Sequence, residues 1–183
     1  SPFSFEDLRR APDVEGPNLV AVDASDRLLL DEAADLLAAA KPGEVVVIGD
    51  HYGALTLGAL AQHHLQGLRV YQDPLVAELA LAGNAERAAR AGLDGTYTSG
   101  DLDADLVRGA RVVLLALPRG LAALDEIAAL IAAHAAPDVV LLAGGRLKHM
   151  TLGMNEVLGR HFGSVTASLA RRKSRVLRAS GPL

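Results

Sequence analysis

One stretch of the sequence places glycines and polar side chains directly after a strand-like run. Residues 45–48 read Val-Val-Val-Ile, and Gly-Asp-His-Tyr-Gly follows at residues 49–53. Glycines at such a turn let the backbone pass close to a nucleotide, and the N–H groups that open the next helix can bind an anion. Gly49, Asp50 and Gly53 are therefore candidate nucleotide-binding residues. The two glycines also fit a tight turn that needs glycine for packing alone.

Two aspartates extend this candidate site. Asp73 stands 24 positions after Gly49, just beyond a second strand-like run, and an acid there can accept hydrogen bonds from ribose hydroxyls. Asp73 also precedes Pro74, so it is equally suited to cap a helix that begins there. Asp101 follows a third, shorter run, from which it can reach an adenine edge. An ordinary loop aspartate is the simpler interpretation of Asp101.

The basic side chains are concentrated near the C-terminus. The net charge is -4, but residues 1–145 sum to -11 and residues 146–183 sum to +7. A basic segment on an acidic body favours an anionic partner on one face, although a solvated helix end and a charged hairpin would look the same. The cations that we expect to contact phosphate groups of such a partner are Arg146, Lys148, Arg171, Arg172 and Lys173.

Other kinds of chemistry lack the residues that they need. The chain has no cysteine, which excludes disulfides, thiolate metal sites and a cysteine nucleophile. The histidines do not cluster at ligand spacing, and no hydrolase or phosphate-loop motif occurs. We therefore expect no metal site. Aromatic residues make up only 3%, which disfavours recognition of bases by stacking on rings.

Length and hydropathy indicate one globular domain. With 183 residues, half of them hydrophobic, the chain can build a core, and we expect an extension at residues 1–17 and a domain at residues 18–181. The N-terminus lacks the pattern of a signal peptide, and the longest apolar stretch, around residues 127–137, is too short to span a bilayer. We expect a cytoplasmic protein without a membrane partner.

Strand-like and helical segments alternate along the chain. The spacing predicts helices over residues 24–40, 54–64, 73–91, 121–135 and 152–161, the first capped by Ser25 or Asp26. It predicts strands over residues 45–48, 68–71, 95–98, 111–116 and 139–143. This alternation indicates a parallel sheet with helices on both faces.

The end of the chain breaks the alternation. Residues 164–170 and 175–179 are β-rich and are joined by the turn 171–173, which predicts an antiparallel hairpin. A doubly wound, mainly parallel seven-stranded sheet that ends in such a hairpin is the α/β, Rossmann-like topology of class I S-adenosylmethionine (SAM) methyltransferases. A nicotinamide-binding Rossmann domain would end on a parallel strand.

Several short motifs, taken in order, resemble one group of enzymes. They lie at residues 49–55, at Asp73 with Asn84, and at residues 115–119, 143–146 and 169–177. Through them, residues 18–179 are similar to the "methyltransferase small" family of ribosomal RNA guanine-N2 methyltransferases, closer to its RlmG type than to its RsmC type. The resemblance implies a transferase that processes ribosomal RNA with SAM.

The resemblance also implies two methyltransferase-like domains in tandem. The C-terminal one binds SAM and carries an Asn-Pro-Pro motif after its fourth strand, whereas the N-terminal one is a degenerate copy that supports the fold and helps to bind RNA. This chain resembles the N-terminal copy. Its catalytic partner domain would follow Leu183.

The departures from the family pattern agree with this interpretation. Val47 stands where an acid is expected, His51 stands where the middle glycine is expected, and residues 116–119 read Ala-Leu-Pro-Arg instead of Asn-Pro-Pro. We expect no catalytic residue, a vestigial cofactor site and no activity of this chain alone. The alternatives are an active SAM-dependent methyltransferase with an atypical first motif, an NAD(P)-binding oxidoreductase domain, or a structural interaction domain.

Overall fold

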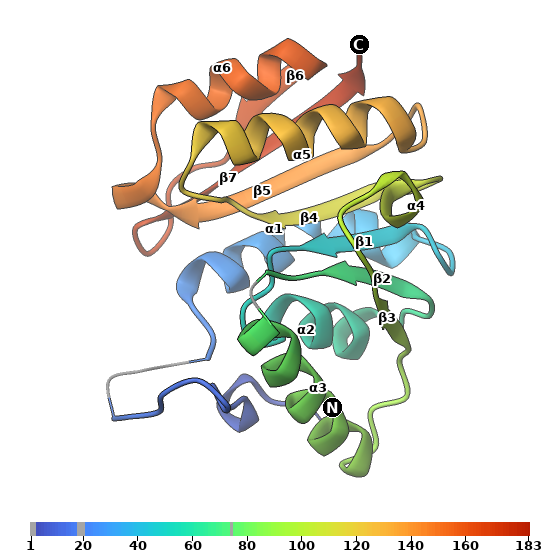
Figure 1. The fold of residues 1–183 in the computed structure, drawn as a ribbon, viewed down its shortest axis with the longest axis vertical. Helices are drawn as coiled ribbons and strands as arrows, with labels where there is room; N and C mark the ends of the chain where they lie inside the picture. The colour runs from blue at the N-terminus through green and yellow to red at the C-terminus, as the bar shows by residue number, and fades with distance from the viewer. Residues whose placement is uncertain (1–2, 18–20, 74) are drawn as a thin grey trace.

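The computed structural model describes residues 3–17, 21–73 and 75–183, and its centre is a seven-stranded sheet (Figure 1). The strand order is β3-β2-β1-β4-β5-β7-β6, in which β1 to β5 run parallel and β7 runs antiparallel to both β5 and β6. This arrangement confirms the predicted doubly wound sheet with its C-terminal hairpin.

The strands follow the apolar runs of the sequence. They are β1 (Val45–Ile48), β2 (Leu68–Tyr71), β3 (Tyr97–Ser99), β4 (Val112–Ala116), β5 (Val140–Arg146), β6 (Phe162–Ala167) and β7 (Ser174–Pro182). All four residues of β1 are buried, as expected for a continuous Val/Ile run covered on both faces of a parallel sheet.

Helices join the parallel strands. They are α1 (Ala24–Ala39), α2 (Ala54–His63), α3 (Leu75–Arg90), α4 (Ala104–Val107), α5 (Leu121–His134) and α6 (Leu152–His161). The single turn α4 and two short 3-10 helices, η1 (Phe5–Asp7) and η2 (Leu147–His149), were not predicted, because one turn carries too little periodicity to detect.

The cap of α1 differs from the prediction. Asp23, and neither Ser25 nor Asp26, is the N-cap: its carboxylate accepts the Ser25 N–H at 2.6 Å. The Asp26 carboxylate accepts the Asp23 N–H at 3.0 Å, which completes a capping box. Three polar residues within four positions made the boundary ambiguous. Pro74 lies outside the described residues, so a helix that begins there stays a prediction.

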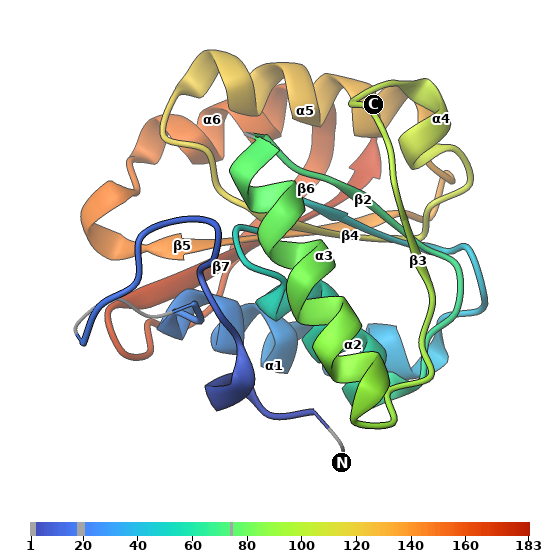
Figure 2. The same ribbon diagram turned by 60° about the horizontal axis from the view of Figure 1, so that its bottom comes forward.

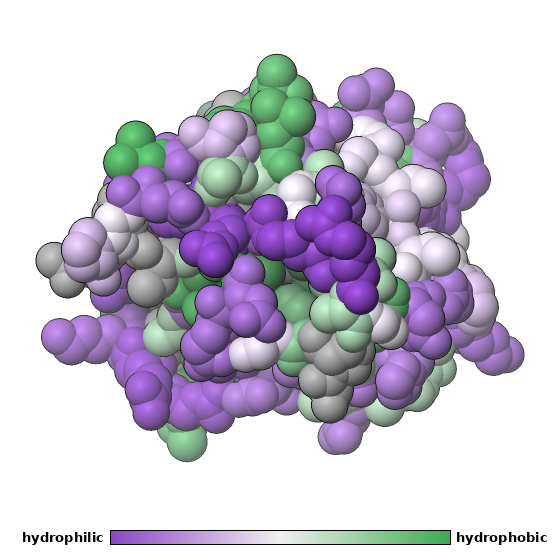
Figure 3. Space-filling model, turned by 90° about the horizontal axis from the view of Figure 1, so that it is seen from below, coloured by the Kyte–Doolittle hydropathy of each residue, from purple (hydrophilic) through white to green (hydrophobic). Residues whose placement is uncertain are grey.

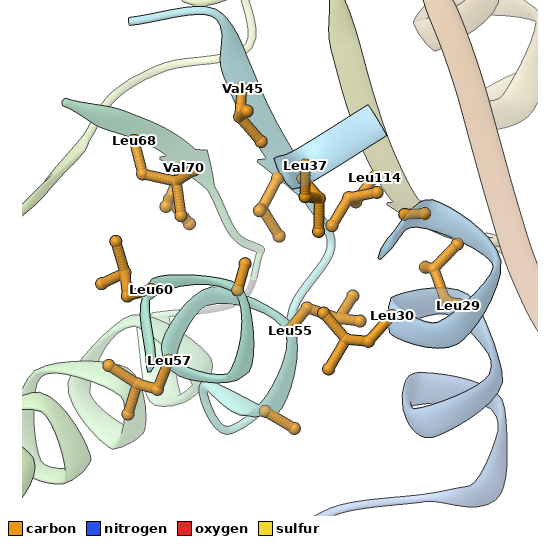
Figure 4. Close-up of a cluster of buried hydrophobic side chains, with 14 of the residues drawn as sticks. Leu29, Leu30, Leu37, Val45, Leu55, Leu57, Leu60, Leu68, Val70 and Leu114 are labelled. Carbon is orange, nitrogen blue, oxygen red and sulfur yellow. The ribbon is translucent and has the colours of Figure 1, made fainter. Parts of the chain in front are cut away.

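The sheet separates two apolar layers. Helices α1, α2 and α3 cover one face, and α4, α5 and α6 cover the other (Figures 1 and 2). Because successive side chains of β1 point to opposite faces of the sheet, Val45 and Val47 pack in the first layer and Val46 and Ile48 pack in the second. Figure 4 shows the first layer, in which leucines of α1 and α2 meet the side chains of β1, β2 and β4.

The segment that precedes α1 packs on the domain. Figure 2 shows it crossing beside α1, α2 and α3. The Phe5 ring contacts α2 so closely that a Cβ on Gly58 would lie 3.3 Å from it, and the Arg27 guanidinium lies 4.4 Å from the ring centroid. The boundary between extension and domain stays a prediction.

The face of the molecule that carries α3 and the N-terminal segment is mainly hydrophilic. Seen from the side of α3 and the N-terminal segment, apolar residues form only small, separate patches (Figure 3). Among the described residues, none of the helices has the length and hydropathy that a membrane crossing requires.

Candidate functional site

A cavity of about 670 Å³ opens at the edge of the sheet where β1, β2, β4 and β5 end. In doubly wound sheets, ligands bind at this carboxyl edge of the parallel strands, and the volume is within the range of small-molecule sites. Apolar side chains line the cavity together with charged ones, and the titratable residues are Asp23, Asp26, His51, Tyr52, Tyr71, Asp73, Arg119, Glu126, Arg146, Lys148 and His149.

Both glycines after β1 are required by the backbone. Gly49 has φ +85°, and a Cβ there would lie 3.2 Å from the carbonyl oxygen of Ala116. Gly53 has φ +100°, and a Cβ there would lie 3.0 Å from Leu81 of α3. Only Gly49 lines the cavity. Packing and backbone conformation therefore account for both residues without a ligand.

The Asp50 side chain is buried at the N-terminus of α2. Its carboxylate accepts the N–H groups of Thr56 at 2.9 Å, Gly53 at 3.2 Å and Leu55 at 3.4 Å. Burial raises the pKa of Asp50, while these three donors act to lower it. Asp50 is not among the cavity-lining residues. The helix N-terminus, where a ligand anion could bind, holds a carboxylate of the chain itself.

Acidic groups gather where β2 ends. Asp73 is exposed and lines the cavity together with Glu126 of α5, whereas Asp101 lies outside the lining and its neighbour Leu102 lies within it. The pKa of Tyr71 is raised by burial and then by the charges of Asp73, Glu126 and Asp101. These carboxylates are therefore close enough to give this side of the cavity a negative potential.

Basic groups gather on the opposite side, where β4 and β5 end. Arg119, Arg146, Lys148 and His149 line the cavity there. Partial burial and then the charges of Arg119, Lys148 and Arg146 lower the pKa of His149, and Asp23 acts in the opposite direction. In the described part of the chain, Arg119, Arg146 and Lys148 form no ion pair.

The turn of the C-terminal hairpin lies beside these cations. Arg146 of β5 pairs in register with Ser174 of β7, and the Leu147 N–H donates to the Lys173 carbonyl at 2.8 Å. Arg171 forms an ion pair with Asp31 of α1. The turn therefore adjoins η2, although the side chains of residues 171–173 do not line the cavity.

Several residues at the cavity were not selected from the sequence. Arg119, Glu126 and His149 all line it. Of these three, only Arg119 could have been selected from the sequence, because it follows the apolar run of β4 just as Asp73 follows that of β2. His51 lies at the cavity edge and is exposed. Ala116, Leu117 and Pro118 line the wall after β4, and they offer no side-chain oxygen or amide.

The fold and the position of the cavity define a class I methyltransferase-type α/β domain. The solved Thermus thermophilus 16S rRNA N2 G1207 methyltransferase (RsmC), in complex with AdoMet and guanosine, matches 87% of this chain and 43% of its own chain, with a TM-score of 0.65 and 23% identity. Precorrin 8W decarboxylase from Methanobacterium thermoautotrophicum matches over 98% and 99% of the two chains, with a TM-score of 0.67 and 18% identity.

The chain belongs to the RLMG N-terminal domain family, whose sequence model matches residues 1–182. A curated relative is the ribosomal RNA large subunit methyltransferase G of Pseudomonas putida (strain W619), which is 32% identical over 188 residues. The match takes in 98% of this chain and 46% of the relative, so the chain spans about half the length of that protein. These findings confirm the resemblance noted from the motifs.

Proposed function

We propose that this chain is the non-catalytic N-terminal half of a SAM-dependent ribosomal RNA guanine-N2 methyltransferase, in which it supports the fold and binds RNA. The family match and the name of the curated relatives support the large-subunit type. The chain's span of 46% of such a relative supports a second, catalytic domain.

The residues that line the cavity after β4 provide the main support for a non-catalytic role. In the Asn-Pro-Pro motif of the family, the Asn side chain and a proline carbonyl together hold the target amino group, so a side-chain acceptor is expected directly after β4. Ala116, Leu117 and Pro118 have no side-chain acceptor, and the Arg119 guanidinium can only donate. Asp50, the acid of the preceding turn, is occupied by three N–H groups of α2. Catalysis therefore belongs to the other domain.

The residues of the cavity fit SAM poorly. Asp73 could accept hydrogen bonds from ribose hydroxyls, but the N-terminus of α2 is filled by Asp50 and the far wall carries Arg119, Arg146 and Lys148. Those cations would repel a sulfonium ion. We therefore assign SAM binding to the whole protein and not to this domain.

The basic C-terminal segment supports the RNA-binding role. Arg146, Lys148, Arg172 and Lys173 are exposed, and the register of β5 with β7 keeps the two pairs on adjoining segments. Exposed cations without carboxylate partners are suited to neutralise phosphates, and such binding weakens steeply with salt.

Two measurements test the proposal. The 183-residue chain, mixed with SAM and ribosomal RNA, is expected to transfer no labelled methyl group, and measurable transfer would overturn the non-catalytic role. Calorimetric titration with S-adenosylhomocysteine, with NAD as the control ligand, is expected to show no heat of binding. Micromolar binding, about -8 kcal/mol, would mean that the cofactor site is functional.

A further inference from the structure

The cavity has acidic groups where β2 ends and exposed cations where β4 and β5 end, and this polarity indicates its ligand. Asp23 and Asp26, at the start of α1, also line the cavity, but both of their carboxylates accept hydrogen bonds of the α1 capping box. Asp73 and Glu126 lie on the side of β2, and Arg119, Arg146 and Lys148 lie on the side of β4 and β5. We propose that the cavity binds one nucleotide of an RNA strand, with the phosphate on the three cations and the ribose hydroxyls on Asp73. This inference rests on the proposed RNA-binding function and names the part of the RNA that the cavity takes.

The spacing of the two walls fits a nucleotide. Between β2 and β4 lies only β1, and β5 follows β4. Neighbouring strands are about 4.8 Å apart, so the acidic wall is roughly 10 to 14 Å from the backbone that carries the cations. Arginine and lysine side chains reach back across part of that distance. The cavity volume of about 670 Å³ is large enough for one nucleotide between the two walls.

The floor between the walls is apolar. Ile48 of β1, Leu115 of β4 and Ile127 of α5 line it, together with Met150 and Met154. Such a surface favours a flat, weakly hydrated group such as a nucleobase over water. The ring of Tyr52 or Tyr71, which also border the cavity, can contact a base face without selecting its sequence.

The cations are available for a phosphate. Arg119, Arg146 and Lys148 are exposed, and no described carboxylate pairs with them. Guanidinium groups bind phosphate through two parallel hydrogen bonds, which makes this wall selective for a phosphate over a sulfonium or an uncharged group. The same wall that disfavours SAM therefore favours a nucleotide of RNA.

A matched pair of variants on α5 separates the cavity from the general surface. Ala123 is exposed and lines the cavity, whereas its neighbour Ala122 is exposed and lies outside the lining. Neither change to tryptophan alters charge, and circular dichroism checks that both variants fold. For a five-nucleotide single-stranded RNA read by fluorescence anisotropy, Ala123→Trp is expected to weaken binding about tenfold. Ala122→Trp is expected to leave it unchanged.

Charge variants test the phosphate contact. Arg119→Ala and Arg146→Ala are each expected to weaken binding of the same RNA and to lower the salt slope by about one. Arg108→Ala is the control, because Arg108 is exposed and lies just before β4, at the opposite edge of the sheet. It is expected to leave the slope at the wild-type value.

Competition against the bound RNA identifies the ligand chemistry. A mixture of nucleoside 5′-monophosphates is expected to compete at lower concentration than the matching nucleosides or inorganic phosphate. Equal competition by inorganic phosphate would overturn the inference in favour of a plain anion site. If the wild type binds RNA and Ala123→Trp binds it equally well, the inference fails and the proposed function stands. If the wild type binds no RNA, the proposed function fails with it.

Discussion

At the scale of single residues, Asp50 is a candidate ligand-binding residue whose side chain the fold itself uses. The Asp50 carboxylate accepts the N–H groups of Leu55 and Thr56 in α2 and of Gly53, its N-cap residue, which burial would otherwise leave without partners. Asp50→Ala is expected to lower the free energy of unfolding by about 2 kcal/mol, because the cap is lost and buried donors remain.

Urea unfolding measures the effect of Asp50→Ala. Asp103→Ala is the control, since Asp103 caps only the short surface helix α4. A smaller loss of stability for Asp50→Ala than for Asp103→Ala would contradict the structural role assigned to Asp50.

Asp26 makes stability depend on pH. Burial, and then the nearby Asp50 charge, raise the pKa of Asp26 to about 8. Because this pKa is above that of an unfolded aspartate, the folded state binds more protons between about pH 4 and pH 8, and stability falls as the pH rises through that window. Asp26→Asn removes this titration and is expected to flatten the decline, as read by urea unfolding at pH 5 to pH 9.

Asparagine at position 26 keeps an oxygen that can accept the Asp23 N–H of the capping box. Asp35→Asn on the same helix removes an equal charge from an exposed site and is the control. An Asp26→Asn profile as steep as the wild-type profile would show that other groups set the pH dependence.

Residue types and spacing in the sequence correctly indicated where the turn after β1 lies, but not where its side chains point. Gly49 and Gly53 were found because a turn after a strand favours glycine. The inward orientation of Asp50 depends on a few dihedral angles that no pattern encodes. Arg119 and His149 join the cavity through the packing of loops from distant parts of the chain, which a single sequence does not reveal.

At the scale of elements, the hairpin between β6 and β7 carries an unusual turn. Arg172 and Lys173 form a two-residue loop with φ +50° and +59°, closed by hydrogen bonds between Arg171 and Ser174. Asn-Gly is the preferred pair for such a loop, since both positions need positive φ. Two long cations at these positions place positive charge at the tip of the hairpin.

Changing this turn to Asn-Gly is expected to have opposite effects on stability and on RNA binding. Arg172→Asn with Lys173→Gly should raise the free energy of unfolding by about 1 kcal/mol and should weaken RNA binding. The double alanine variant loses the same two charges, but alanine does not favour the positive φ angles that this turn requires. It should therefore weaken RNA binding without the gain in stability. Unchanged RNA affinity in both variants would show that the hairpin turn is not part of the RNA-binding surface.

The N-terminal segment is attached to α3 mainly through one side chain. Asn84 donates to the carbonyl groups of Tyr52 at 2.6 Å and Arg9 at 2.8 Å, and it accepts the Arg9 N–H at 2.8 Å. Asn84→Ala is expected to make residues 3–17 the first site of cleavage in limited proteolysis, because these contacts are lost. Glu86→Ala, at an exposed site of α3, serves as the control. Cleavage that begins elsewhere would show that other contacts hold the segment.

Element types were easier to predict than their ends. The apolar runs of β1 and β4 and the long helices α1 and α5 follow from local pattern, because burial on both faces leaves little choice of residue. The edge strand β3 has three residues, none of them buried, and its predicted limits were two positions early at the start and one position early at the end. The register of β5 with β7, which brings Arg146 to the hairpin, is a long-range property.

At the scale of the whole molecule, the uneven charge of the sequence becomes a spatial asymmetry. The basic residues 146–183 form η2, α6, β6 and β7, which close one end of the sheet (Figure 1). The hairpin turn and the cavity cations Arg146 and Lys148 lie on adjoining segments at this end, so both can meet an anionic strand that approaches it. A body with excess negative charge repels the same strand elsewhere, so the asymmetry also orients the encounter.

This asymmetry predicts a kinetic signature in a two-domain protein that carries this chain as its N-terminal half. If the chain only holds RNA, replacing Arg119, Arg146 and Lys148 by alanine removes binding energy that is equal in the ground state and the transition state. KM for ribosomal RNA should then rise about tenfold while kcat and KM for SAM stay unchanged. Steady-state methyl transfer measures all three constants. Alanine at Arg90, Arg108 and Arg111, which are exposed and lie outside the cavity lining, removes the same number of cations and is the charge-matched control. A lower kcat with an unchanged KM for RNA would instead place these cations in the chemical step.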